Sequence, residues 1–353
     1  MDFFNAPVHK WYSINQRDLP WRKTRDPYLI WLSEVIFQQT RIDQGLAYYN
    51  RFAEAFPTIA DLANASEDQV LKLWQGLGYY SRARNLHQTA KYINDQLNGV
   101  FPEEHHLILK LKGIGGYTAA AIASISFNKE YPAVDGNVYR VLSRYFGIST
   151  PIDSTAGKKE FYNLALELIR GTDPGMHNQA IMEFGALQCI PRNPVCSVCP
   201  LTTKCYASIN NKAGEFPVKL KRTSQRNRYF NYIVIDGKDY FWIRKRTDDD
   251  IWKNLYEFPL VETENKTELD EVLLAAQQSN IINPKVPIVV EEISNWKTHI
   301  LSHQRIHFRF IRLSHHNEIT SEADLIKVSK QDIFNFAVPR LLEAYLSAHS
   351  SKH

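Results

Sequence analysis

The sequence has no apolar run long enough to cross a membrane. Its longest candidate, residues 117–127, is short and contains Ala, Ser and Thr, whereas a spanning helix needs about 20 predominantly apolar residues. The first residues lack the basic start and the apolar core of a secretory signal. We therefore expect a soluble, cytoplasmic protein that does not bind membranes.

Neither sign of charge is in strong excess. The chain of 353 residues has 42 Lys and Arg against 38 Asp and Glu, a net charge of +4 with His neutral. This balance permits contact with nucleic acid through one basic face but does not require it. Hydrophobic residues at 44% and charged residues at 23% are ordinary globular values, so extensive disorder is excluded. The length suits two domains.

Cysteine is scarce, and its few positions are clustered. The chain has 4 cysteines in the pattern C-x6-C-x2-C-x5-C, at Cys189, Cys196, Cys199 and Cys205. In a chain without an export signal, such a cluster indicates a metal site more often than a disulfide framework. Four thiolates satisfy either a tetrahedral zinc ion or a [4Fe–4S] cluster, and the ligand type alone does not choose between them.

The first part of the chain is predicted to be helical. Up to about Tyr206, apolar residues recur at intervals of three and four, as in residues 61–73, 82–97 and 158–169. A basic stretch at 212–228 follows. Its charge suits a phosphate backbone, and a solvated connector explains it equally well.

The second part mixes strands and helices. β-branched and aromatic runs predict strands at 229–235, 239–244 and 306–313, with a tight turn at Asp236-Gly237. Amphipathic patterns predict helices at 268–277 and 334–348, and we expect the residues after about His349 to be frayed. The predicted fold class is therefore multi-domain: an all-α domain at 1–211, a basic linker at 212–228 and an α+β domain at 229–349.

A glycine-rich turn is the first functional signal. Gly113 and Gly115, in LKGIGGYTAAA at 111–121, let the backbone turn tightly before a helix whose free N–H groups can bind a phosphate. Alone, the turn fits an ordinary helix–helix connection at least as well. However, AVDGNVYR at 133–140 and then the four cysteines follow it. This succession resembles the helix-hairpin-helix DNA glycosylases that contain an iron–sulfur cluster.

Three further motifs narrow the resemblance. RDLPWR at 17–22, WLSEVIFQQT at 31–40 and GLGYYSRARNL at 76–86 look like the adenine DNA glycosylases of the MutY type. Members of that family remove adenine mispaired with 8-oxoguanine or guanine. The likeness extends through both parts of the chain. It implies base-excision repair on double-stranded DNA, and we expect a monomer.

Two carboxylates suit this chemistry. Cleavage of the N-glycosidic bond needs an acid at the base and an anion near the sugar, where positive charge grows. Glu34 follows Trp31 and Leu32, which can desolvate it and raise its pKa. The resemblance implies that Glu34 protonates adenine at N7 and then handles the water, and that Asp135 stabilises the sugar cation. It assigns supporting hydrogen bonds to Tyr117 and Asn137. Spacing alone would favour a paired carboxylate for Glu34 and a turn or cap residue for Asp135.

Position 117 decides the reaction subtype. Related bifunctional glycosylases have a lysine nucleophile at this point of the glycine turn, where this chain has Tyr117. Lys112 lies on the other side of the turn. We therefore predict a monofunctional enzyme that leaves an abasic site.

The resemblance also assigns residues that bind the flipped adenine and fill the gap in the duplex. Arg17, Trp21 and Glu183 match positions of the adenine pocket, and Gln39 and Tyr79 match positions inserted near the lesion pair. Without the resemblance, core packing for the aromatic residues and a surface charge for Arg17 would be the better explanations. The cysteine spacing matches the [4Fe–4S] loop at 189–205, for which we expect a structural role. Zinc remains a minor alternative.

The second domain looks like a Nudix domain without its catalytic helix. WKNLYEFP at 252–259 resembles the strand-and-turn segment of that fold, but ELDEVLLAAQ at 268–277 lacks the R-E-x-x-E-E carboxylates that hold Mg²⁺. The resemblance implies that it recognises 8-oxoguanine through Ser302 and His303. The family usually has Phe before this pair, and this chain has Leu301, which puts a stacking contribution in doubt. A Ser-His turn without a ligand is the alternative.

Three other functions compete with an adenine glycosylase. One is a helix-hairpin-helix glycosylase for thymine mismatches or damaged pyrimidines, and another is a non-catalytic, metal-containing DNA-binding protein. The third is a Nudix hydrolase, which the missing carboxylate helix opposes. Intact Glu34 and Asp135 argue against a non-catalytic protein.

Overall fold

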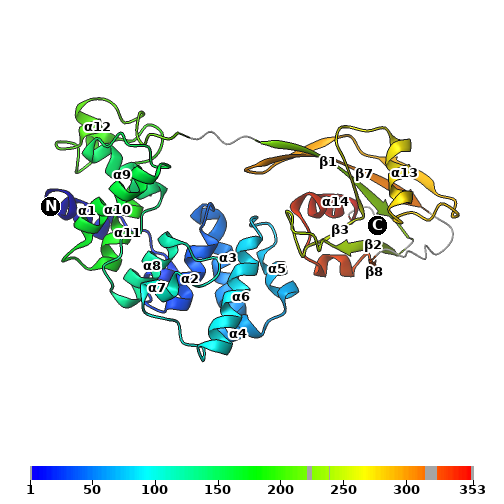
Figure 1. The fold of residues 1–353 in the computed structure, drawn as a ribbon, viewed down its shortest axis with the longest axis horizontal. Helices are drawn as coiled ribbons and strands as arrows, with labels where there is room; N and C mark the ends of the chain where they lie inside the picture. The colour runs from blue at the N-terminus through cyan, green and yellow to red at the C-terminus, as the bar shows by residue number, and fades with distance from the viewer. Residues whose placement is uncertain (1, 221–224, 238, 315–323, 351–353) are drawn as a thin grey trace. The chain divides into compact units, whose positions relative to one another are not determined.

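The computed structural model describes residues 2–220, 225–237, 239–314 and 324–350. The chain forms two compact units, one of Met1–Asn64 with Asn85–Lys221 and one of Ala65–Arg84 with Arg222–His353. The first part of the chain is helical and the C-terminal part is α+β (Figure 1), which confirms the predicted fold class. The frayed end predicted after His349 lies mostly outside the described residues. No described helix is long and apolar enough to span a bilayer.

The helical part is a succession of short, capped helices. Polar side chains cap several of them: Asp26 accepts from the Tyr28 N–H, and Asp173 accepts from the Met176 N–H. The helices are α1 (Asp2–Asn15), α2 (Pro27–Ile36), α3 (Ile42–Ala55), α4 (Ile59–Asn64), α5 (Glu67–Trp74), α6 (Ser81–Gln96), α7 (His105–Ile108), α8 (Gly116–Phe127), α9 (Gly136–Phe146), α10 (Thr155–Ile169), α11 (Pro174–Leu187) and α12 (Tyr206–Ile209).

The continuous helix predicted at 61–73 is wrong, because the chain forms α4 and α5 there. Ser66 and Gln69 make a capping box: the Ser66 hydroxyl accepts from the Gln69 N–H, and the Gln69 side chain accepts from the Ser66 N–H. This pair of bonds starts a new helix and ends the apolar periodicity of the previous one.

The core of the first unit gathers around α8 and α11. Residues Thr118 to Ile125 of α8 are all buried, and Ala at four of these positions lets neighbouring helices approach closely. A second cluster joins Phe4 of α1, Phe161 of α10 and Phe184 of α11, all fully buried. These packed helices hold the ends of α2, α8 and α9 in fixed positions.

The basic stretch at 212–228 is only partly a connector. Phe216 is buried, the Ile152 N–H donates to the Val218 carbonyl at 3.0 Å, and the Leu220 N–H donates to Asp153 at 2.9 Å. The segment up to Leu220 is thus held by these bonds to residues 152–153, and the first strand begins at Arg226.

The C-terminal part contains two small sheets. One has the order β4-β1-β7-β5, with β6 also paired to β7, and the other has the order β3-β2-β8. Figure 1 shows β1 beside β7, with which it pairs in parallel. The strands are β1 (Arg226–Ile235), β2 (Tyr240–Lys245), β3 (Tyr256–Glu257), β4 (Leu260–Thr263), β5 (Val289–Ile293), β6 (Lys297–Ile300), β7 (Gln304–Ser314) and β8 (Leu325–Ser329).

Alternating residues of β1 and β7 cover the two faces of the larger sheet. Ile233 and Ile311 pack with helix α13 (Leu269–Gln278) on one face. On the other face Phe310 stacks on Tyr345 of α14 (Arg340–Ser350), with ring centroids 4.1 Å apart. The three predicted strands and the helix at 268–277 are confirmed within one to three residues.

Two local predictions differ from the structure. The turn at Asp236-Gly237 is present, with the Gly237 N–H donating to the Tyr240 carbonyl at 2.9 Å, but β1 and β2 belong to different sheets and are linked by an isolated bridge from Asp236 to Phe241. The helix predicted at 334–348 begins only at Arg340. A short 3-10 turn at Asp332–Asn335 precedes it, and Pro339 starts the helix because proline has no N–H to donate within it.

Candidate active site

One cavity of about 850 Å³ brings most of the predicted catalytic residues together. It lies in the first unit, among the end of α2, the start of α8, the start of α9 and the end of α11. The predicted residues that line it are Arg17, Trp21, Glu34, Gln39, Tyr117, Asp135, Asn137 and Glu183.

Glu34 lies on α2, most of which is buried. Its neighbours Trp31, Leu32 and Val35 pack into the core, and Glu34 keeps part of its surface toward the cavity. Burial raises the pKa of Glu34 to about 7, and the negative charge of Asp135 acts in the same direction. Hydrogen bonding with Tyr117 opposes this shift. A carboxyl group with this pKa is present in both its acid and its base form at neutral pH.

Tyr117 lies in the first turn of α8, where the glycine turn places it beside Glu34 and Asp135. Its hydroxyl donates to the Sδ atom of Met182 at 3.2 Å. Burial raises the pKa of Tyr117 well above its usual value, so the phenol stays neutral. The sequence reasoning missed Met182, because an apolar helix position gives no sign of a hydrogen-bond acceptor.

Asp135 is both the N-cap of α9 and a side chain of the cavity. Its Oδ1 accepts from the N–H groups of Asn137 and Val138 at 2.9 and 2.8 Å, and its Oδ2 accepts from Asn137 Nδ2 at 2.7 Å. Burial raises the pKa of Asp135, and these hydrogen bonds oppose the rise. The carboxylate is therefore held rigidly at the point where the helix N-terminus also favours negative charge.

A polar chain leads from Asp135 toward the cysteines. Asn137 Oδ1 accepts from Arg140 Nη2 at 2.7 Å, and Arg140 Nε donates to the carbonyl of Cys189 at 2.7 Å. Arg140 also donates to the Gly185 carbonyl at 2.6 Å. The N-terminal end of α9 and the first cysteine are thus joined through the side chains of Asn137 and Arg140.

Glu183 is buried and forms ion pairs with two arginines. It accepts from Arg17 Nε at 2.9 Å and from Arg22 Nη1 at 2.8 Å. Despite its burial, these bonds lower the pKa of Glu183 to about 2. Arg22 was not among the predicted site residues, although it lies in the RDLPWR motif. Trp21, from the same motif, packs against Phe37 with ring centroids 4.5 Å apart.

The glycine turn needs its glycine at position 113. Gly113 has φ +79°, and a Cβ there would lie 2.6 Å from the Cβ of Asn85. Gly115 is the N-cap of α8. Lys112 is exposed, and among the described residues that line the cavity none is a lysine.

The two residues predicted to enter the duplex have left-handed backbones. Gln39 has φ +55° and Tyr79 has φ +48°, and both are exposed. A left-handed conformation costs energy for residues other than glycine and is concentrated at functional sites. Gln39 lines the cavity, whereas Tyr79 belongs to the second unit.

The four cysteines line one small, mostly apolar cavity beside α9 and α11. They form no disulfide. Arg144 of α9 holds the loop between them, because it donates to the Ile190 and Pro191 carbonyls at 2.8 and 3.0 Å and to Cys189 Sγ at 3.4 Å. In the described part of the chain, no three ligating side chains stand close enough to share a single metal ion.

The residues predicted to recognise 8-oxoguanine form the turn between β6 and β7. The Leu301 N–H donates to the Gln304 carbonyl at 2.8 Å and closes the turn, with Ser302 and His303 exposed at its tip. The first turn of α13 has two acidic residues, Asp270 and Glu271.

Comparisons with known proteins show the family of this chain. Residues 32–169 match the family described as HhH-GPD superfamily base excision DNA repair protein, and residues 231–348 match the NUDIX domain. An adenine DNA glycosylase from Buchnera aphidicola subsp. Acyrthosiphon pisum is 38% identical over 257 residues, which cover 72% of this chain and 73% of that protein. The chain belongs to the adenine DNA glycosylases.

Other relatives match a smaller part of this adenine DNA glycosylase. The adenine DNA glycosylase of Homo sapiens is 41% identical over 213 residues, which cover 58% of this chain and 39% of that protein. A solved thermostable thymine-DNA glycosylase superposes with a TM-score of 0.55 at 30% identity, covering 59% of this chain and 95% of that one. That structure matches only part of the chain, so the relatives that match more of it decide the family.

Proposed function

We propose that this adenine DNA glycosylase hydrolyses the N-glycosidic bond of adenine mispaired with 8-oxoguanine or guanine in duplex DNA, and leaves an abasic site. The observation that carries the proposal is that Glu34 and Asp135 face one cavity in different surroundings. Burial raises the pKa of both carboxyl groups, but three hydrogen bonds from N–H groups oppose the rise at Asp135, whereas only the hydroxyl of Tyr117 opposes it at Glu34. A difference of this kind lets one carboxyl group, Glu34, act as the acid while the other, Asp135, acts as the anion. The cavity has the size of a ligand pocket, and adenine must leave the duplex to enter it.

Glu34 and Asp135 divide the reaction between them. Protonated Glu34 donates its proton to adenine N7, and the electrons of the C1′–N9 bond leave with the base. The anionic Asp135 stabilises the positive charge that develops on the sugar. Glu34, now ionised, takes a proton from the water that adds to C1′. Asn137 orients Asp135, and Tyr117 supports Glu34.

A monofunctional reaction is supported by the described residues that line the cavity, because none of them is a lysine. A Schiff base requires a lysine that reaches C1′, and the described lining of the cavity provides Tyr117 instead. Lys112 is exposed and is not among those lining residues. β-Elimination by the purified protein would contradict this part of the proposal.

The four cysteines would hold a [4Fe–4S] cluster, because their spacing C-x6-C-x2-C-x5-C resembles the cluster loop of the family and all four line one cavity. The cluster would cross-link the loop at 189–205; hydrolysis itself needs no electron.

The turn at 301–304 would recognise the oxidised base. The exposed Ser302 and His303 offer hydrogen-bonding groups to the altered edge of 8-oxoguanine, which guanine satisfies only in part. We expect Ser302→Ala combined with His303→Ala to lower the preference for 8-oxoguanine over guanine. An unchanged preference would refute this assignment.

The central experiment uses a labelled duplex with one adenine opposite 8-oxoguanine, and a control duplex with thymine in place of that adenine. Wild-type protein and Glu34→Ser are incubated with each duplex, and the products are resolved with and without hot alkali. We expect alkali-dependent cleavage at the adenine by the wild type alone. Tight binding without cleavage would instead support the non-catalytic DNA-binding protein.

A further inference from the structure

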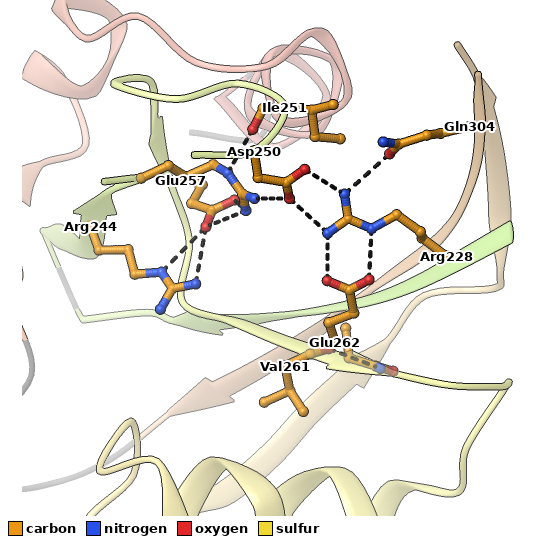
Figure 2. A network of polar contacts seen from close by, with 10 residues as sticks. Arg228, Arg244, Asp250, Ile251, Glu257, Val261, Glu262 and Gln304 are labelled. Atoms are coloured by element: carbon orange, nitrogen blue, oxygen red, sulfur yellow. Dashed lines mark hydrogen bonds and ion pairs between the residues drawn. The ribbon is translucent and has the colours of Figure 1, made fainter. Parts of the chain in front are cut away.

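A partly buried chain of alternating charges is joined to the turn at 301–304 by a hydrogen bond from Arg228 to Gln304. Its ion pairs run in the order Glu262, Arg228, Asp250, Arg246, Glu257 and Arg244. Figure 2 labels all of these side chains except Arg246. Three arginines and three carboxylates make the chain neutral. Glu257 has no exposed side-chain surface, and the side chains of Arg246 and Arg228 are 5% and 9% exposed.

Arg228 of β1 uses all five of its N–H donors in this network. Nε and Nη2 donate to the two oxygens of Glu262 at 2.7 and 2.6 Å, and Nη1 and Nη2 donate to those of Asp250 at 2.9 and 2.7 Å. The remaining Nη1 donor binds Oε1 of Gln304 at 3.1 Å. Two bidentate ion pairs thus fix the guanidinium, and Gln304 is its one neutral acceptor.

Gln304 is the last residue of the turn and the first residue of β7. Two other bonds reach the turn through its backbone. The Arg226 N–H of β1 donates to the His303 carbonyl at 3.0 Å, and Nε2 of Gln225, the residue before β1, donates to the Leu301 carbonyl at 3.2 Å. Among the described hydrogen bonds from β1 to the turn, only the bond from Arg228 joins a charged donor to a side chain of the turn. That side chain is Gln304, the residue after His303.

We propose that Arg228 is a positioning residue for the turn at 301–304, and that it sets the preference for 8-oxoguanine through its hydrogen bond to Gln304. The proposal rests on the proposed recognition of 8-oxoguanine by Ser302 and His303. A lysine in place of Arg228 has three donors and no planar fork. It can keep an ion pair, but it cannot hold two carboxylates and the amide together.

The test measures single-turnover adenine release by the full-length protein, opposite 8-oxoguanine and opposite guanine. Gln304→Met removes the acceptor and keeps the length of the side chain. We expect it to lower the ratio of the two rates roughly fivefold, since one hydrogen bond to a charged group is lost. Arg228→Lys should lower the ratio similarly. The double variant should lower it no further than the larger single effect, because both changes remove the same bond.

Arg244→Met is the matched control. Arg244 pairs with Glu257 at the other end of the network and does not contact Gln304. It should keep the rate ratio even where it lowers the melting temperature. If Arg228→Lys does not fold, the pair of Gln304→Met and Arg244→Met decides alone.

The outcomes separate this inference from the function on which it rests. An unchanged ratio in Gln304→Met, together with a lost preference in the Ser302→Ala, His303→Ala variant, overturns the role of Arg228 only. Additive losses in the double variant also overturn it, because Gln304 would then act independently. An unchanged preference in the Ser302→Ala, His303→Ala variant overturns the proposed recognition of 8-oxoguanine itself.

Discussion

Asn137 donates from Nδ2 to Oδ2 of Asp135 over 2.7 Å. The same amide accepts from Arg140 through its oxygen, at 2.7 Å. Asn137 therefore fixes the carboxylate on one side and is itself fixed on the other, and its amide cannot rotate without breaking both bonds.

Replacement of Asn137 by Ala should slow adenine release by about tenfold or more, because Asp135 loses one of its three hydrogen bonds and its orientation. Binding of the duplex should change much less, since the bond matters most when charge develops on the sugar. Single-turnover rates and duplex affinities separate the two effects. Asn15→Ala, at an exposed position of α1, serves as the control, and equal losses in both variants would contradict the prediction.

The rate of adenine release should fall as pH rises through about 7. The acid form of Glu34 is the reactive one, and its pKa is raised from 4.5 to about 7. A pH–rate profile under single-turnover conditions measures this descending limb. A limb centred near pH 4.5 would show that Glu34 titrates as an ordinary carboxyl group.

Ionised Glu34 should lower the free energy of unfolding at high pH. Because its pKa is higher in the folded state than in the unfolded state, the fold prefers the protonated form, and stability is lost as pH rises from about 4.5 through 7. Glu34→Gln should therefore raise the free energy of unfolding at pH 8, on the order of 1–2 kcal/mol after allowance for solvent screening. At pH 4 it should have little effect. Denaturant unfolding at both pH values tests the sign.

Loss of Arg22 should destabilise the first unit. Glu183 is buried and shares its charge with Arg22 and Arg17, so Arg22→Met leaves a buried carboxylate with one partner, at a cost of about 2–4 kcal/mol. Lys23→Met removes an ion pair of two exposed side chains with Asp18 and should cost less than about 0.5 kcal/mol. Thermal melting compares them, and equal shifts would show that Arg22 adds nothing to Arg17.

Met182→Leu should move the descending limb of the pH–rate profile to lower pH. In the present structure the Tyr117 hydroxyl donates to the sulfur of Met182. The Tyr117 hydroxyl also stabilises ionised Glu34, and without the competing sulfur its single proton is left to Glu34 alone, so the pKa of Glu34 falls further. Met176→Leu, whose side chain packs on the core of the same unit, should leave the limb in place. A limb that stays fixed in both variants would show that the sulfur has no influence.

Sequence patterns predicted the site residues that lie in the long motifs. Glu34, Asp135 and Glu183 come from three helices, and the structure places them around one cavity. Their environments could not be predicted in the same way. The hydrophobic neighbours of Glu34 did indicate a raised pKa, whereas the second arginine beside Glu183 depends on how the loop after α1 folds back on α11.

Residues whose role depends on tertiary contacts were missed. Met182 has no distinguishing pattern in the sequence, and Arg228 lay in a stretch predicted to be a linker. Arg22 lies in the RDLPWR motif, but the motif does not show which carboxylate it meets. The helix predicted at 61–73 failed for a local reason, since the capping box at Ser66 interrupts an otherwise continuous periodicity. Propensity and spacing locate helices well, but they do not reveal which polar atoms meet across them.

The double role of Asp135 has a consequence for how variants of this protein are interpreted. Its side chain caps the N-terminal end of α9 and also faces the reacting sugar in the proposed mechanism. The same hydrogen bonds that form this end of the helix therefore also place the carboxylate that stabilises the sugar cation. Fraying of one helical turn would inactivate the protein while leaving most of its fold intact. Loss of activity at position 135 therefore reports on folding and chemistry together, and only a separate measurement of helix content divides them.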